Sequence, residues 1–411
     1  MTATVPEATT ARPTLSKLPS LTGLRFFAAL LVFFFHITLS NSPIPPNDPI
    51  NPFADQQLGS TLEWLVSKAG YVGVSFFFVL SGFLLAWASK PGEPKRQFWR
   101  RRLLKIFPNH LVMWVLSMVL FAAAINPPLG WISNLFLVNS FIPDGAVYVA
   151  VNPPSWTLNS ELLFYMLFPL LMIPVRKIPG NRLWLWAWLM VAAMVAVQLV
   201  TTHLIPATPV SALTPVSVTQ FWFGYIFPPS RLFEFILGSI LALIVLSGRW
   251  LPVKMWHALA LCVIGYAVAM VVPFVYSFNV ATIIPVAAII CTVASMDIAG
   301  RTGFLGSKPM VWLGNISFGF YLCQGVVIFY GRILLGDQLY STPMALLVIA
   351  GFFIATLLGG WALYGLVEKP VMDRWARPRR KTPAAAAPVP VVVSDPASGQ
   401  AAGDALSGVG R

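Results

Sequence analysis

The sequence predicts an all-α polytopic membrane protein of about ten transmembrane helices, with both termini in the cytoplasm. Three observations predict this class. Of the 411 residues, 57% are hydrophobic and only 10% are charged, whereas soluble domains carry about 25% charged residues. Apolar segments long enough to cross a bilayer recur along the chain. The basic residues gather in alternate connections between those segments.

Ten apolar segments approach the roughly 20 residues that a membrane-spanning helix needs. They cover residues 21–40, 71–89, 104–125, 158–175, 183–203, 231–248, 255–273, 279–296, 311–331 and 345–367. The first is long enough to span and has no convincing small-residue cleavage site, so we expect a retained helix and not a signal peptide. Residues 131–142 are apolar but too short to span, which suits a re-entrant or interfacial segment.

The positions of the charges test this order independently. Of the 27 basic residues, all except Arg25, Lys68, Arg231 and Arg332 fall on one side of the predicted membrane. The positive-inside rule makes that side the cytoplasm and places both termini there. The net charge of +13 is therefore a topology signal, and we expect no nucleic-acid binding.

Composition also predicts the domain organisation. Residues 1–17 form a cytoplasmic N-terminal segment and 18–372 form one transmembrane domain without an internal repeat. Residues 373–411 form a cytoplasmic tail rich in proline and alanine, which we expect to be disordered. The three cysteines lie singly within apolar segments, so we expect neither a disulfide nor a metal site.

Two polar residues lie inside the first predicted helix. Arg25 and His36 are eleven positions apart, which is only about 20° beyond three helical turns and about 16 Å along the axis. Both therefore face the same way. A charged arginine in the membrane needs a protein interior or a wet cavity, which makes this face a candidate site. The alternative is an arginine that reaches to the interface and a histidine with a structural role.

Three further clusters are candidates for chemistry. We interpret the basic run 95–108 as a cytoplasmic loop that serves topology, and the planar guanidinium groups of its arginines also suit the phosphates of an anionic cytosolic ligand. Glu161, at the outer end of the fourth segment, enters the membrane without an adjacent base, which by default indicates a functional carboxylate. Arg231 and Glu234 are three apart on a helix, so they either pair with each other or contact a substrate.

Together these pieces resemble the acyltransferase 3 family of bacterial membrane O-acyltransferases, from about residue 18 to 370. The pieces that match, in order, are Arg25 and His36 with ten residues between them, the segment 73–83, the basic run that ends at 106–108, the segment 155–165, Arg231 with Glu234, the segment 312–322, and 368–370. Two positions depart from the family pattern: Lys105 replaces an arginine, and Gln324 stands near the place of a histidine. His36 is then the one well-placed histidine, and we interpret His110, His203 and His257 as structural.

The resemblance implies transfer of an acyl group from acyl-coenzyme A, as co-substrate, to a hydroxyl group, with no metal and no resident cofactor. His36 is then the general base, or forms a transient acyl-histidine. Arg25 lies along the path of the donor's pantetheine arm, and Glu161 orients the histidine or holds the acceptor. The coenzyme A phosphates rest on the four basic residues Arg100, Arg101, Arg102 and Lys105. The candidate oxyanion donors are Ser81, Trp156 and Tyr165.

The resemblance further implies a bacterial cytoplasmic membrane and an acceptor that is either a cell-surface glycan or a secreted metabolite. We favour a small secreted metabolite such as a macrolide antibiotic. A proton-coupled carrier or exporter is the alternative function, because carriers also hold arginine, histidine and glutamate within the membrane. Carriers are often built from repeated halves, of which this sequence shows no sign.

Overall fold

The computed structural model describes residues 17–376 except for 91, 212 and 337. Within that range the chain is helical and forms no β-strand, which confirms the predicted all-α class. The predicted disordered tail lies outside the described residues from 377 onward, as does most of the N-terminal segment. The helices are α1 (Pro19–Ile37), α2 (Gln56–Val66), α3 (Ala69–Ala88), α4 (Lys95–Ser117), η1 (Met118–Ala122), α5 (Ala123–Ile125), α6 (Pro128–Leu135), η2 (Asn139–Phe141), α7 (Gly145–Tyr148), η3 (Pro153–Ser155), α8 (Trp156–Arg176), η4 (Gly180–Arg182), α9 (Leu183–His203), α10 (Val218–Phe221), η5 (Trp222–Ile226), α11 (Pro228–Leu246), α12 (Met255–Val271), η6 (Phe274–Ser277), α13 (Ile283–Ile298), η7 (Phe304–Gly306), α14 (Lys308–Gln324), η8 (Gly325–Tyr330), α15 (Gly331–Leu334), α16 (Thr342–Ala362), η9 (Leu363–Glu368), α17 (Lys369–Val371) and η10 (Met372–Ala376).

In the part of the chain that the structure describes, 8 helical segments are long and apolar enough to cross a membrane. They are Pro19–Ile37, Gln56–Ala88, Lys95–Ile125, Pro153–Arg176, Gly180–His203, Val218–Leu246, Lys308–Leu334 and Thr342–Ala376. Two shorter apolar helices, α12 and α13, occupy the other two predicted segments. Residues 131–142, predicted not to span, form the end of α6 and the single turn η2.

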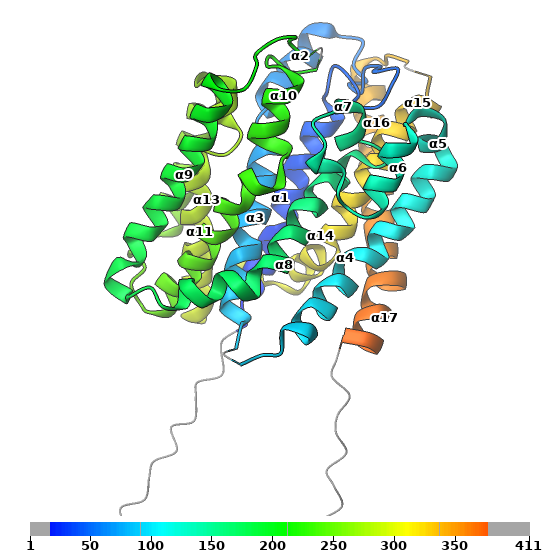
Figure 1. The fold of residues 1–411 in the computed structure, drawn as a ribbon. Helices are drawn as coiled ribbons and strands as arrows, with labels where there is room; N and C mark the ends of the chain where they lie inside the picture. The colour runs from blue at the N-terminus through cyan, green and yellow to red at the C-terminus, as the bar shows by residue number, and fades with distance from the viewer. Residues whose placement is uncertain (1–16, 91, 212, 337, 377–411) are drawn as a thin grey trace, which may run out of the picture. The chain divides into compact units, whose positions relative to one another are not determined.

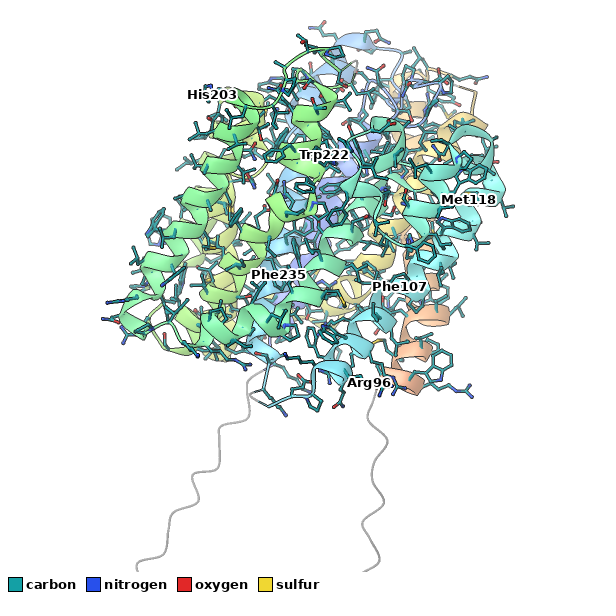
Figure 2. The ribbon with its side chains drawn as sticks, viewed as in Figure 1. Arg96, Phe107, Met118, His203, Trp222 and Phe235 are labelled. Carbon is teal, nitrogen blue, oxygen red and sulfur yellow. The ribbon has the colours of Figure 1, made fainter. Side chains whose placement is uncertain are left out.

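The two ends of the helical bundle carry different elements of the chain. Arg96 lies at one end and His203 at the other (Figure 2). We call the first the basic end, and α17 also lies there (Figure 1). The short helices α2, α7, α10 and α15 lie at the opposite end, which we call the far end (Figure 1). The start of α4 and the last described helices thus lie at the same end of the bundle.

The outer surface of the bundle is apolar. Large side chains such as Trp188 on α9, Val263 on α12 and Leu347 on α16 are more than half exposed. Such a surface would aggregate in water, whereas lipid chains solvate it. The molecule is therefore a multi-pass membrane protein.

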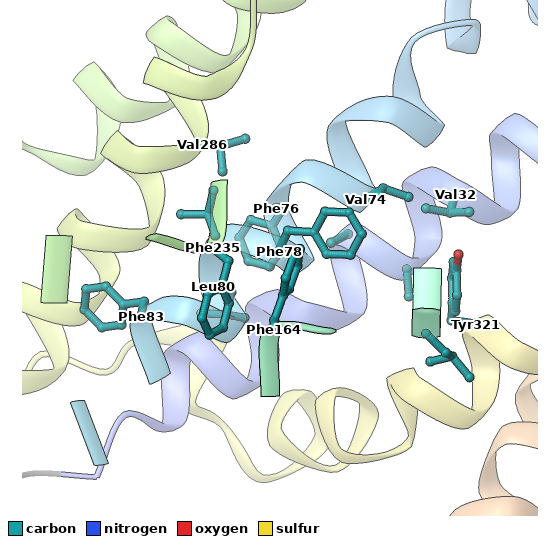
Figure 3. Close-up of a cluster of buried hydrophobic side chains, with 14 of the residues drawn as sticks. Val32, Val74, Phe76, Phe78, Leu80, Phe83, Phe164, Phe235, Val286 and Tyr321 are labelled. Atoms are coloured by element: carbon teal, nitrogen blue, oxygen red, sulfur yellow. The ribbon is translucent and has the colours of Figure 1, made fainter. Parts of the chain in front are cut away.

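The core lies where α3 and α11 cross, with α1, α8 and α14 around them. Phe78 of α3, Phe164 of α8 and Phe235 of α11 meet at its centre, with ring centroids 5.2 and 4.9 Å apart in successive pairs (Figure 3). These rings are almost completely buried. They hold together the three helices on which much of the candidate site depends.

One difference from the sequence prediction matters for the site. The basic run was expected to precede the third span as a loop, but α4 begins at Lys95 and carries the run on its first turns. Pro94 is the N-cap of α4, so it lies before the helix and does not interrupt it. The arginines, lysines and leucines that follow have good helix propensity, and they extend α4 to the basic end. The position of each arginine on the helix therefore determines the side of α4 from which its side chain projects.

Two glycines allow α3 and α11 to touch through their backbones. A Cβ atom on Gly82 of α3 would lie 1.9 Å from the carbonyl oxygen of Phe235. A Cβ atom on Gly238 of α11 would lie 1.9 Å from the carbonyl oxygen of Val79. Small residues that permit such close approach are the usual means of packing helices in lipid, where the hydrophobic effect does not drive association.

We expect Gly82→Val to prevent folding, because the valine side chain must force the α3 and α11 backbones apart. Size-exclusion chromatography in detergent and thermal unfolding measure the effect. Gly351→Val on α16 is the matched control, since nothing lies within 4 Å of the Cβ position at that residue. A Gly82→Val protein as monodisperse and as stable as the control would contradict this account of the crossing.

Candidate active site

Three cavities lie in a row through the bundle. The inner cavity, of about 740 Å³, is nearest the basic end, and the outer cavity, of about 380 Å³, is nearest the far end. A small middle cavity of about 40 Å³ shares Arg25 and Glu161 with the inner cavity. It shares Val74 and Tyr321 with the outer cavity. The middle cavity thus adjoins both of the larger ones.

The inner cavity is strongly basic. Four cationic side chains line it and one carboxylate, so its walls have a net positive charge. The charged residues are Lys17, Arg25, Arg102, Lys105 and Glu161. Their positive potential in a cleft between apolar helices attracts anions.

The four basic residues predicted as a phosphate site separate in the structure because α4 is helical. Arg102 and Lys105 are three positions apart, so they share a face and both line the inner cavity. Arg101 points elsewhere and forms an ion pair with Glu93. Arg100 is exposed and does not line the cavity.

Two contacts hold the cavity cations in position. The Arg102 guanidinium lies over the rings of Phe98 and Tyr165, 5.5 and 5.6 Å from their centroids. Lys105 forms an ion pair with Glu368 of η9, and Glu368 also accepts a hydrogen bond of 3.0 Å from Asn109. Glu368 is 4% exposed, so α4 and η9 meet through a buried carboxylate.

Glu161 of α8 lines the inner and middle cavities and not the outer one. It interacts electrostatically with Arg25 and Lys105 and accepts a hydrogen bond of 3.5 Å from the Tyr165 hydroxyl. Tyr165 in turn accepts one of 3.4 Å from Ser81 of α3. These polar groups form a chain along one wall of the inner cavity.

His36 lines the outer cavity, three turns along α1 from Arg25. Its Nδ1 atom lies 2.7 Å from Oε1 of Gln324, the last residue of α14. The Gln324 amide nitrogen donates to the carbonyl oxygen of Ala29 over 3.4 Å, which turns the amide oxygen toward the histidine. An amide oxygen only accepts, so this contact assigns a proton to Nδ1, and in the neutral imidazole Nε2 then keeps its lone pair.

The rest of the outer cavity is aromatic and uncharged. Among the described residues that line it, none is Asp, Glu, Lys or Arg. Tyr71, Tyr148, Trp156 and Tyr225 supply aromatic faces and polar edges. Of the three predicted oxyanion donors, Trp156 lies here, whereas Ser81 and Tyr165 line the inner cavity.

A hydrogen bond marks the boundary between the middle and outer cavities. Tyr321 of α14 lines both spaces. Its hydroxyl accepts from Thr157 over 3.1 Å and donates to the carbonyl oxygen of Pro154 over 3.0 Å. The contact ties the start of α8 to α14 beside the narrowest space.

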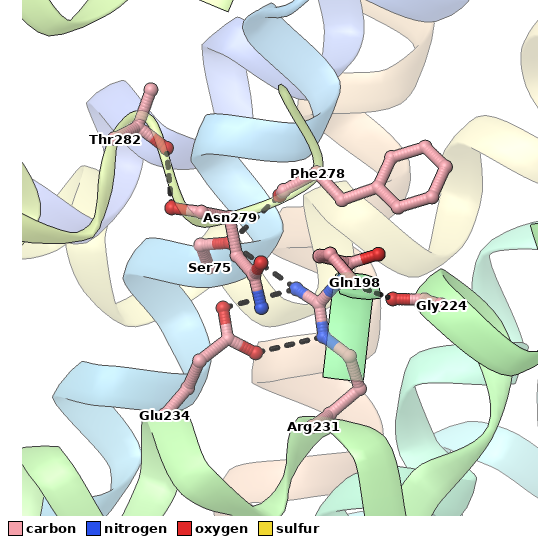
Figure 4. A network of polar contacts seen from close by, with 8 residues as sticks. All are labelled: Ser75, Gln198, Gly224, Arg231, Glu234, Phe278, Asn279 and Thr282. Atoms are coloured by element: carbon pink, nitrogen blue, oxygen red, sulfur yellow. Dashed lines mark hydrogen bonds and ion pairs between the residues drawn. The ribbon is translucent and has the colours of Figure 1, made fainter. Parts of the chain in front are cut away.

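Arg231 and Glu234 form an ion pair and line none of these three cavities. Both are fully buried, with Nε and Oε2 2.7 Å apart, and Arg231 also donates to Ser75 over 3.2 Å (Figure 4). The guanidinium lies 4.8 Å from the ring centroid of Tyr225, which separates the pair from the outer cavity. Of the two alternatives left by the sequence, the structural ion pair fits this position.

The other histidines make local contacts. His110 is buried on α4, with Nε2 3.0 Å from the carbonyl oxygen of Asn134. His257 accepts from the backbone N–H of Lys254 at the start of α12. His203 is the last residue of α9, at the far end (Figure 2).

Comparisons with known proteins give the family. A family model described as an acyltransferase domain matches residues 18–365. The acyltransferase MdmB of Streptomyces mycarofaciens is 37% identical over 399 residues, which cover 93% of this chain and 98% of MdmB.

The chain belongs to the acyltransferase 3 family.

More distant relatives agree on the reaction. The putative peptidoglycan O-acetyltransferase YrhL of Bacillus subtilis is 25% identical over 88% of this chain and 56% of its own length. The peptidoglycan O-acetyltransferase OatA of Listeria monocytogenes is 24% identical over 88% of this chain and 57% of its own. The chain thus spans little more than half of these two proteins. No solved structure matches it.

This member of the acyltransferase 3 family is therefore a membrane O-acyltransferase, and we set aside the carrier or exporter alternative. Its acyl donor and its hydroxyl acceptor must both reach the membrane-embedded bundle. The three cavities are candidate spaces for them.

Sequence reasoning gave no role to three residues of the candidate site. Gln324 was noted only as a departure from the family pattern, although it holds His36. Tyr321 and Glu368 lie in segments that carried the resemblance but received no role. A polar residue within an apolar span was the available signal for each of them.

The ion pair gives a direct test of its structural role. We expect Glu234→Leu to lose about 3–5 kcal/mol of stability, because it leaves the Arg231 charge buried without a partner. The double variant Arg231→Met/Glu234→Leu removes both charges, so we expect it to recover most of that loss. Thermal unfolding in detergent measures both. Equal losses in the single and the double variant would contradict a purely structural pair.

Proposed function

We propose that the acyltransferase moves an acyl group from acyl-coenzyme A in the inner cavity to a hydroxyl of a neutral acceptor in the outer cavity, with His36 as general base. The observation that carries the proposal is the contrast between the two large cavities. The inner cavity is cationic, whereas the outer cavity is uncharged and aromatic and is lined by His36, which Gln324 orients. Acyl-coenzyme A is then a co-substrate, and the proposal requires no metal and no resident cofactor.

Charge supports acyl-coenzyme A as the donor. Its nucleotide end carries several phosphate charges, which match the cations of the inner cavity. Arg102 is suited to this task, because its guanidinium lies over the rings of Phe98 and Tyr165 and can bind phosphate oxygens with two N–H groups at once. The Nε atom of Arg102 is buried without a hydrogen-bond partner among the described residues, so this guanidinium has an unsatisfied N–H donor beside the inner cavity.

The direction of the bundle supports the same donor. By the positive-inside rule the basic end faces the cytoplasm, where coenzyme A is made. We propose the bacterial cytoplasmic membrane as the location. The nucleotide would then enter at the basic end, and the pantetheine arm would pass Arg25 and the middle cavity toward His36. Arg25 and His36 are about 16 Å apart along α1, which a long flexible arm is suited to cover.

The chemistry follows from the tautomer of His36. Nε2 takes the proton of the acceptor hydroxyl while that oxygen attacks the thioester carbonyl carbon. The tetrahedral intermediate collapses to the ester and expels the coenzyme A thiolate, which takes the proton back from Nε2. A transient acyl-histidine would instead use the same Nε2 lone pair as the nucleophile.

The developing oxyanion needs a hydrogen-bond donor near His36. Of the three predicted donors, Trp156 is the one that lines the outer cavity, so we propose its indole N–H for this role. Glu161 stands among the cations of the inner cavity, where it would position the donor's arm and Arg25 and not His36.

The uncharged lining of the outer cavity favours a neutral acceptor. A charged glycan fragment would lose its hydration there without gaining an ion pair, which is unfavourable. A sugar ring or a glycosylated macrolide can lay its C–H face on Tyr71, Trp156 or Tyr225 and bond its hydroxyls to their polar edges. We therefore favour a neutral glycoside of a secreted metabolite.

We expect His36→Ala to lower turnover at least about 100-fold, as the loss of a general base usually does. The measurement is release of free thiol from acetyl-coenzyme A by purified protein in detergent, with a macrolide and a peptidoglycan fragment as acceptor probes. His257→Ala is the matched control, because that histidine caps α12 away from the cavities. Gln324→Met removes the acceptor of the Nδ1 proton and should lower turnover about tenfold or more. Gln324→Glu keeps an acceptor oxygen and should retain more activity than Gln324→Met. Full activity in His36→Ala would contradict the proposed base.

We expect Arg102→Ala and Lys105→Ala each to weaken coenzyme A binding about tenfold, since a charge-assisted hydrogen bond contributes roughly 1.5–3 kcal/mol before screening. Isothermal titration calorimetry measures the dissociation constant without any need for an acceptor. Arg182→Ala, an exposed cation in the connection between α8 and α9, is the control. Equal weakening in Arg182→Ala would show a general charge effect and not a site in the inner cavity.

A further inference from the structure

A separate groove opens at the basic end, between the start of α14 and the end of α16 with η9. Its volume is about 550 Å³. The lining residues are Gly306, Lys308, Val311, Trp312, Asn315, Trp361, Tyr364, Gly365 and Lys369. It touches the inner cavity only at Val311, which lines both. The groove has no part in the acyl transfer proposed above.

The charge of the groove is positive. Lys308 and Lys369 line it and are exposed, and among its described lining residues there is no Asp or Glu. Glu368 is next to Lys369 in the chain but points the other way, because it is buried against Lys105 and Asn109 of α4. The groove therefore suits an anionic ligand group.

The aromatic residues indicate where the groove lies relative to the lipid. Trp312 and Trp361 both line it and are exposed, 43% and 54% respectively. Exposed tryptophans at a helix end mark the level of the lipid headgroups in a membrane protein. The two lysines are thus at the depth at which lipid phosphates lie.

The groove continues into an apolar stripe on α16. Leu347, Ile354, Leu358 and Trp361 are exposed, and their spacing of seven, four and three residues places them on one face of the helix. This stripe runs along the bilayer side of α16 and ends in the groove at Trp361. Beside it, a Cβ atom on Gly365 would meet nothing within 4 Å, so the wall is open there. An anionic head with an attached hydrocarbon chain fits this combination.

We propose that this groove binds one anionic phospholipid of the leaflet at the basic end. The lipid phosphate lies between Lys308 and Lys369, and an acyl chain follows the α16 stripe from Trp361 toward Leu347. A free phosphate or nucleotide has no use for the stripe. A zwitterionic phospholipid also carries a phosphate, but its own ammonium group offsets that charge and weakens the attraction to the two lysines.

The test measures lipid binding by native mass spectrometry of the purified full-length protein. The protein is titrated in detergent with phosphatidylglycerol and, in parallel, with phosphatidylcholine of the same chains. We expect one phosphatidylglycerol to bind more tightly than any phosphatidylcholine. We expect Lys308→Gln/Lys369→Gln to weaken that first site about 25-fold, as each lysine near an anionic lipid surface contributes roughly fivefold. Trp361→Ala should weaken both lipids, since it removes contact with the chain.

The matched control is Lys90→Gln/Lys177→Gln, which removes two exposed lysines that line neither the groove nor the inner cavity. It should leave the first phosphatidylglycerol site unchanged. Thermal unfolding without added lipid checks that every variant is folded. Equal weakening in both double variants, or equal affinity for the two lipids, would overturn the proposal. Displacement of the lipid by coenzyme A or inorganic phosphate would also overturn it, because it would assign the groove to a soluble anion.

Discussion

The cost of a charged side chain in a hydrocarbon layer governs the arrangement of this acyltransferase. Arg25 lies inside α1, so the surrounding helices must enclose it, provide water and supply opposite charge. At the inner cavity Glu161 of α8 supplies that opposite charge, while Arg102 and Lys105 of α4 line the same space and make its net charge positive. Elsewhere in the described bundle the same cost is met by pairing, as in the fully buried contact between Arg231 and Glu234. The cluster of cations thus lies near the basic end, and the buried charge of Arg231 is neutralised by its neighbour on the same helix.

This constraint also accounts for the difference between the two large cavities. The inner cavity lies near the basic end, where the positive-inside rule already favours lysine and arginine. Its positive walls therefore need few charged residues deep in the membrane. The outer one is lined by tyrosine, tryptophan and asparagine, which give polarity without charge. A single rigid element, α1, connects them, with Arg25 at one cavity and His36 at the other. The distance between the sites is therefore determined by helical geometry and not by a flexible loop.

Local properties of the sequence were enough to predict the helices and the shared face of Arg25 and His36. Each span needs only its own apolar residues, and eleven residues return a helix to nearly the same direction. We expected all four basic residues to share one phosphate site because we took the basic run as a loop. On a helix, Arg102 and Lys105 share a face that Arg100 does not, so the helical period alone predicts that the four residues cannot all line one cavity. The contact between His36 and Gln324 joins residues 288 positions apart, and that between Lys105 and Glu368 joins residues 263 apart. No local pattern encodes such pairs, since they depend on how the helices pack.

Gln324 shows how the uncharged cavity and the proposed chemistry fit together. The family resemblance leads one to expect a histidine near this position, and a carboxylate is the common partner of a catalytic histidine. A carboxylate here would bring charge into an apolar wall without a cation beside it. The amide oxygen provides the same acceptor for the Nδ1 proton without that charge, and its own orientation is held by the Ala29 carbonyl. His36 is thereby kept in the tautomer with a free Nε2 lone pair, which is the form that a general base needs at the start of the reaction.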